Sequence, residues 1–234
     1  MDIMEKVFIH LSVFSDGTLK AIAKETVDKE VLAILAKDEN ITVRIAVVQN
    51  KSTSEDVLVF LAKDENVKVR IAVDKNESTP ESILTTLAMD NSSDVRQCVA
   101  ANTKVSTKTL ETLAKDKEAC VRMAVATNEK TSSKILASLA KDEEVCVRGA
   151  VAINKNTSES ILKILVDDES RYVKRWVVEN PNCPESILAI LSKNEEVFIR
   201  RAVADNPKTP RDVLVMLSND EYDVVRYTAQ KNII

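Results

Sequence analysis

The stretch Thr79-Pro-Glu-Ser-Ile-Leu-Thr-Thr-Leu-Ala-Met-Asp90, followed by Asp94-Val-Arg-Gln-Cys-Val-Ala-Ala-Asn102, decides the fold. Apolar residues recur in each half at three- and four-residue intervals, which is typical of two short amphipathic helices. Thr79 is predicted to be the N-cap of the first helix, with Pro80 at its first position. Asn102 is predicted to end the second helix in a left-handed conformation. The stretch therefore predicts a compact helix pair.

The same pattern returns every 26 residues without an insertion, in eight copies. One column holds a cation in every copy: Arg44, Arg70, Arg96, Arg122, Arg148, Lys174, Arg200 and Arg226. A second column is always asparagine: Asn50, Asn76, Asn102, Asn128, Asn154, Asn180, Asn206 and Asn232. A helix pair this small cannot bury its apolar stripe alone, whereas stacked copies share a continuous core. The repeat predicts an all-α solenoid.

The domain organisation follows from the register of the repeats. We expect one solenoid domain at residues 27–234, made of the eight copies, preceded at residues 1–26 by an N-terminal cap with a degenerate repeat. In that degenerate copy Thr18 and Lys24 stand in the cation and asparagine columns. The apolar segment at residues 7–14 is expected to cover the open end of the stack, as terminal repeats must.

Two features of the repeat carry a family resemblance. The spacing of Asp38 and Arg44 is similar to that of the Asp and Arg positions of HEAT repeats. The segment Arg200-Arg-Ala-Val-Ala-Asp-Asn-Pro-Lys-Thr-Pro210 resembles the leucine-rich repeat variant family, whose motif reads VRxAVAxNPxTP before LxxLAxD. Ile199 and Ser218 depart from that motif. The resemblance spans residues 27–232 and implies a right-handed superhelix with a binding role. Some members carry an iron–sulphur cluster ahead of the repeats, but no cysteine precedes Cys98 here.

Composition favours a non-enzymatic protein. The net charge is −4, the sequence has a single histidine, His10, and it contains no Gly-rich phosphate loop or nucleophile elbow. The four cysteines form no CxxC pair, so we expect free thiols and neither a metal nor a cofactor. The N-terminus lacks the features of a secretory signal, and no apolar run approaches the roughly 20 residues that span a bilayer. These features predict a cytoplasmic protein.

The cation column has a structural interpretation. Aspartates lie six residues before almost every cation, so we expect charge pairs within and between repeats that fix the stacking. Two positions break the pattern, because Lys174 replaces arginine and Asn194 replaces aspartate. We expect Asn194 to leave a neighbouring cation, with Arg200 as the candidate, without its usual carboxylate. The asparagine column is expected to cap backbone groups, and so are the threonines represented by Thr79.

Unusual residues gather around that break. Trp, Tyr and Arg are enriched in binding hot spots, and they predict a basic–aromatic partner-binding surface. Its members are Arg171, Tyr172, Lys174, Arg175, Trp176, Phe198, Arg200, Arg201 and Tyr227. Alternatively, Trp176 is part of the core and the other residues are ordinary surface.

Two functions remain open. The first is a protein–protein interaction scaffold whose partner, with acidic and apolar segments, lies along the second helices of the repeats. The second is a nucleic-acid-binding HEAT-like protein that uses the basic–aromatic surface, although the net charge of −4 disfavours it. A glycosylase-like activity through one aspartate is a more remote alternative. Salt dependence separates the first two, because phosphate binding weakens steeply with salt. We expect a monomer, but the sequence does not determine the oligomeric state.

Overall fold

The computed structural model describes residues 13–233, and all seventeen elements in this range are helices. The chain divides into two compact units, Met1–Thr109 and Leu110–Ile234. The division falls inside α9 (Thr107–Leu113). The predicted end-covering segment at residues 7–14 lies, apart from its last two residues, outside the described part of the chain. Within residues 13–233, no helix is both long and apolar enough to cross a bilayer.

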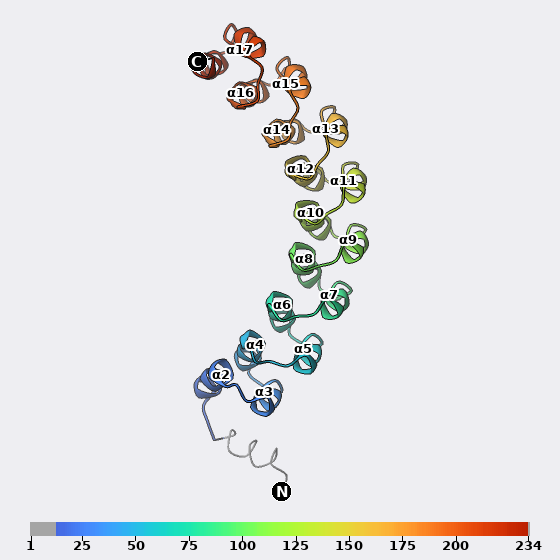
Figure 1. Cartoon of the computed structure of the whole chain (residues 1–234), viewed down its shortest axis with the longest axis vertical. Coiled ribbons are helices and arrows are strands. Elements are labelled where there is room, and N and C mark those ends of the chain that lie inside the picture. Colours follow the sequence, from blue (N-terminus) through green and yellow to red (C-terminus); the bar gives the residue numbers. More distant parts are fainter. Residues whose placement is uncertain (1–12, 234) are drawn as a thin grey trace. The chain divides into compact units, whose positions relative to one another are not determined.

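The helices of each unit alternate between two rows, as Figure 1 shows. The helices of the first unit are α2 (Asp16–Glu25), α3 (Lys29–Leu35), α4 (Ile41–Gln49), α5 (Glu55–Leu61), α6 (Val67–Lys75), α7 (Glu81–Leu87) and α8 (Ser93–Ala101). Those of the second unit are α10 (Ala119–Thr127), α11 (Ser133–Leu139), α12 (Val145–Ile153), α13 (Glu159–Leu165), α14 (Arg171–Glu179), α15 (Glu185–Leu191), α16 (Val197–Asp205), α17 (Arg211–Leu217) and α18 (Asp223–Asn232). This alternation confirms the predicted α-solenoid.

The core lies between the two rows. The leucine that ends each odd-numbered helix is at most 3% exposed: Leu35, Leu61, Leu87, Leu113, Leu139, Leu165, Leu191 and Leu217. Valines of the even-numbered helices, such as Val73 and Val177, are fully buried opposite them. Even-numbered helices also pack directly on the next even-numbered helix of their unit, for example α4 on α6 and α14 on α16. The even row therefore holds successive repeats together.

The threonine column caps a different helix end from the one predicted. Pro80 is the N-cap of α7, which begins at Glu81, so the prediction for Thr79 is wrong. The Thr79 hydroxyl instead donates to the carbonyl of Val73, near the end of α6, at 2.6 Å. Carbonyls at a helix C-terminus lack intrahelical donors, and the buried hydroxyl supplies one. Cys183 occupies this column in the seventh repeat, where burial raises the pKa of its thiol to about 11.

The asparagine column caps the even-numbered helices and joins consecutive repeats. Asn180 is the C-cap of α14, and its Nδ2 donates to the carbonyls of Ala152 and Asn154 at 2.6 and 3.0 Å. Its Oδ1 accepts from the backbone N–H of Asn182. The capping role is thus confirmed. The left-handed conformation is wrong, since Asn180 has φ −64° and ψ 129° and no non-glycine residue in 13–233 has a positive φ. An extended backbone aims the side chain at the preceding repeat.

The cation column forms a ladder of buried ion pairs. Arg44 donates from Nε and Nη2 to the two carboxylate oxygens of Asp64, at 2.6 and 3.0 Å. Its Nη1 donates to the carbonyls of Asp38 and Glu39. The same bidentate rung recurs in Arg70–Asp90, Arg122–Asp142, Arg148–Asp168 and Arg200–Asp220.

Each of these five arginines is therefore connected to the next repeat. The predicted pairing between repeats is confirmed, but the contact within a repeat goes to the backbone of the aspartate and not to its carboxylate. The hydrogen bond from Arg200 lowers the pKa of Asp220. Such charge-assisted bidentate bonds are among the stronger ones in proteins.

Asp74 is an irregularity in the packing of α6 on α8. It is only 3% exposed, and the residues at the same repeat position are apolar in most copies, for example Ala100 and Ala126. Its carboxylate accepts one hydrogen bond, from Asn102 Nδ2 at 2.9 Å. Burial raises the pKa of Asp74, because desolvation disfavours the charged form more than this hydrogen bond favours it. The charged form thus weakens this contact.

We expect Asp74→Ala to raise the free energy of unfolding at pH 7 by about 1–2 kcal/mol. The folded-state pKa lies above the unfolded one, so the wild type loses stability as the pH rises through the folded-state value. The gain from the substitution should therefore shrink as the pH falls towards about 4, the ordinary range of the carboxyl. Urea denaturation of both proteins at several pH values measures this. A destabilised variant at pH 7 would contradict the interpretation.

Candidate partner-binding surface

The two irregular ladder positions belong to one rung. Arg200 keeps its carboxylate partner, Asp220, at 2.7 Å, so the prediction that Arg200 lacks one is wrong. In the five bidentate rungs the arginine pairs with the aspartate 20 residues later, and the position that corresponds for Lys174 is Asn194. The bidentate pair is thus replaced at both ends, by an ammonium and an amide. Lys174 is half-buried, and no ion pair to a carboxylate is found for it within residues 13–233.

Trp176 is positioned by a glycine of the preceding repeat. Its position holds alanine in most copies, including Ala150 and Ala202. A Cβ atom on Gly149 of α12 would overlap Cε3 and Cζ3 of the Trp176 ring. The indole therefore occupies the space that the Gly149 side chain would need, and it is half-buried. Sequence spacing alone did not connect these two residues, because they lie 27 positions apart.

An aromatic cluster extends from Trp176 across α14 to α16. The ring of Tyr172 lies 6.5 Å from that of Trp176 and 6.3 Å from that of Phe198, centroid to centroid. The guanidinium of Arg171 lies over both the Tyr172 ring, at 5.3 Å, and the Phe198 ring, at 5.7 Å. Glu196 pairs with Arg171 at 3.3 Å. We call Arg171, Tyr172, Trp176 and Phe198 the aromatic cluster.

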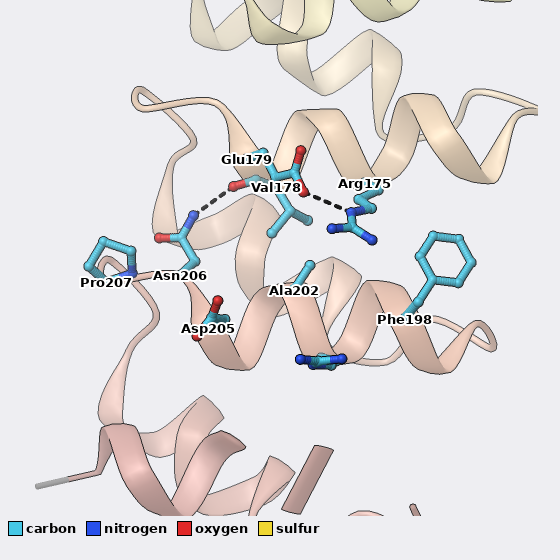
Figure 2. Close-up of a pocket in the computed structure, with 9 residues that line it drawn as sticks. Arg175, Val178, Glu179, Phe198, Ala202, Asp205, Asn206 and Pro207 are labelled. Carbon is cyan, nitrogen blue, oxygen red and sulfur yellow. Dashed lines mark hydrogen bonds and ion pairs between the residues drawn. The ribbon is translucent and has the colours of Figure 1, made fainter. Parts of the chain in front are cut away.

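A groove of about 350 Å³ lies beside this cluster, between α14 and α16. It is lined by Arg175, Arg201, Phe198 and the carboxylate residues Glu179 and Asp205, among others. Figure 2 shows Arg175 directed at Glu179, which it contacts at 2.7 Å, and Phe198 at the opposite end of the groove from Pro207. The two arginines are balanced by two carboxylates, so the groove has no net charge. Sequence reasoning had not included these carboxylates in the site.

The structure separates the nine predicted residues into groups. It brings Arg171, Tyr172, Trp176 and Phe198 into contact and places Arg175 and Arg201 on the adjoining groove. Arg200 is 7% exposed and belongs to the ladder. Lys174 stands in the ladder row. Tyr227 is 72% exposed on α18.

Aromatic and basic side chains make up the exposed part of this surface. Tyr172 is 53% exposed, and Arg171, Arg175 and Arg201 are exposed as well. Within residues 13–233, no group of three or more His, Cys, Asp or Glu side chains is arranged to hold a metal ion. The cluster combines aromatic faces with guanidinium groups, which suits contacts with apolar and acidic groups.

Comparison with known proteins supports the fold. The chain is similar to a solved structure described as a leucine-rich repeat variant with a novel repetitive protein structural motif, with a TM-score of 0.69 and 23% identity over 87% of this chain and 81% of that one. It is also similar to the YibA protein of Escherichia coli, with a TM-score of 0.51 and 20% identity over 94% and 97% of the two chains. No family model matches the chain, and no curated protein matches it. The resemblance to leucine-rich repeat variants is confirmed at the level of the fold.

The contact between Gly149 and Trp176 leads to a prediction. We expect Gly149→Ala to lower the free energy of unfolding by about 1–3 kcal/mol, because the new methyl group overpacks against the indole. In a Trp176→Ala background the same change should stabilise the protein by up to about 1 kcal/mol, because alanine favours the helix more than glycine does. Denaturant titration of the four proteins measures both effects. Equal costs in the two backgrounds would exclude the contact as the cause.

Proposed function

We propose that this protein is a non-enzymatic protein–protein interaction scaffold. It binds its partner along the face of the even-numbered helices, in the cytoplasm and as a monomer. The observation that carries this proposal is the aromatic cluster on α14 and α16, in which the exposed Tyr172 ring and Arg171 guanidinium lie beside two half-buried rings. Interfaces favour such side chains. The similarity of the fold to other repeat solenoids is consistent with a binding role.

The repeat itself explains how such a face can be specific. The ladder, the asparagines and the leucines occupy the same positions in almost every copy, which leaves the exposed positions of the even-numbered helices free to vary. One variable column of these helices is half-buried in its first four copies, buried in the fifth and exposed in the last three. Its members are Ile45, Ile71, Gln97, Met123, Gly149, Arg175, Arg201 and Tyr227. Weak contacts to several repeats add up through a high effective concentration. A partner with acidic and apolar segments is the best match for this column.

The partner site is assigned to the aromatic cluster and the groove beside it. Arg175 and Arg201 line the groove and project from successive helices, so their side chains can pair with carboxylates of the partner. Tyr172 and Phe198 offer apolar surface next to them. The balancing effect of Glu179 and Asp205 disfavours a continuous phosphate backbone as the ligand.

The test is affinity capture from lysate of the source organism, with and without nuclease, followed by mass spectrometry. We expect a discrete protein partner that survives nuclease and is lost, by about tenfold or more, with Arg175→Glu/Arg201→Glu. A charge-matched control, Lys193→Glu/Arg211→Glu, changes exposed residues at α15 and α17 and should retain the partner.

Two outcomes would contradict the proposal. Recovery that disappears with nuclease would indicate a nucleic-acid ligand, and the binding would then weaken steeply as salt is raised. If the Arg175→Glu/Arg201→Glu variant and the Lys193→Glu/Arg211→Glu control recover the partner equally, the partner does not bind at the α14–α16 groove.

A further inference from the structure

A second groove lies at the equivalent position in the other unit, between α4 and α6. Its volume is about 560 Å³, and its lining includes Ile45, Val48, Ile71 and Ala72. Residues at the same repeat positions line the α14–α16 groove, five repeats later. Ile45 corresponds to Arg175, and Ile71 to Arg201. The solenoid therefore forms the same hollow in both units and lines it with different side chains.

The two grooves differ in the net charge of the residues that line them. Lys51, Lys68 and Lys75 line the α4–α6 groove together with a single carboxylate residue, Glu77. Three lysines and one glutamate give a net charge of +2, whereas two arginines and two carboxylates leave the α14–α16 groove neutral. Gln49, Lys68 and Lys75 replace Glu179, Phe198 and Asp205, and this gain of positive charge outweighs the replacement of the two arginines by Ile45 and Ile71. The lysine groove is thus the more basic of the two.

The three ammonium groups are free to meet a ligand. All three lysines are exposed, and none of them forms an ion pair with a carboxylate of residues 13–109. The nearest other carboxylate on α6, Asp74, is 3% exposed and bonded to Asn102. Lysine carries a compact charge on a flexible stem, so it pairs with carboxylates in varied positions.

The aliphatic residues at the floor of the groove indicate that the ligand also carries an apolar side chain. Ile45, Ile71 and Ala72 are half-buried, and Val48 is fully buried beneath them. This aliphatic floor fits a leucine, isoleucine or phenylalanine side chain, which would displace water from it. The lining contains no aromatic residue on which a base could stack, and single-stranded nucleic acids rely on such stacking. The chemistry favours a peptide over a nucleic acid.

We propose that the α4–α6 groove is a second docking site, which binds an acidic peptide segment of a partner protein. One aliphatic or aromatic side chain of that segment contacts Ile45 and Ile71, and flanking carboxylates pair with Lys68 and Lys75. This goes beyond the proposed function, because it assigns a separate docking site in the other unit.

The test is selection of a random-peptide library on the full chain. We expect the selected peptides to be enriched in Asp and Glu beside Leu, Ile or Phe. Their affinity, measured by fluorescence anisotropy, should fall by about tenfold or more with Lys68→Glu/Lys75→Glu, because two ion pairs are lost and two carboxylates that repel the peptide take their place. Ile71→Gln should weaken the same peptides without changing the charge of the groove.

The matched control is Lys115→Glu/Lys141→Glu, which makes the same change of net charge at exposed lysines outside the groove. It should retain the affinity of the wild type for these peptides. Circular dichroism of each variant checks that the helices persist.

The inference would be overturned if selection gives no binders, or gives peptides without acidic residues. It would also be overturned if the groove variant and the Lys115/Lys141 control bind equally well. If peptide binding is lost only with Arg175→Glu/Arg201→Glu, the peptides bind the α14–α16 groove. That result would contradict this inference but not the proposed function. A labelled single-stranded oligonucleotide that binds the α4–α6 groove with the affinity of the peptides, and loses it with Lys68→Glu/Lys75→Glu, would also contradict the peptide as the ligand.

Discussion

The bidentate pair between an arginine and the aspartate of the next repeat is the contact on which the stacking depends. The helices have seven to ten residues, and helices this short are marginal in water without tertiary support. Each rung fixes the register of one repeat on the next while its third nitrogen satisfies carbonyls of its own repeat. Burial of leucine and valine supplies the main driving force, and the rungs and asparagines make the stacking specific.

The residues that pack the repeats leave one face of the even-numbered helices uninvolved in packing. Because the packing uses the same few positions in each copy, exposed residues of the even-numbered helices can change without loss of the fold. The repeat that contains α14 departs from the common pattern at several positions. Lys174 and Asn194 replace the arginine and aspartate of the bidentate pair, and Trp176 replaces alanine. Gly149, which has no side chain, leaves room for the indole ring. These departures coincide with the aromatic cluster, as expected where local rules are relaxed for function.

The sequence was sufficient for the helices and their alternation, because a 26-residue period with apolar stripes leaves few other solutions. It was insufficient where a side chain has several possible partners. Thr79 and Asn102 were both recognised as caps, but spacing does not determine whether a cap serves its own helix or the neighbouring one. The same limit applies to the ladder, where Asp38 and Asp64 are both plausible partners of Arg44. The predicted basic surface also included Arg200, which is buried, and omitted Glu179, because only three-dimensional contacts show which charges cancel.

The most direct test of this account is a double-mutant cycle on one rung. Arg148→Ala, Asp168→Ala and the double variant would be compared with the wild type by urea denaturation, so that effects on other partners of each residue cancel. A buried bidentate pair that fixes the stacking predicts a coupling free energy of about 2 kcal/mol or more. A coupling below about 0.5 kcal/mol would mean that the two substitutions are independent, and the ladder would then not be what holds successive repeats in register.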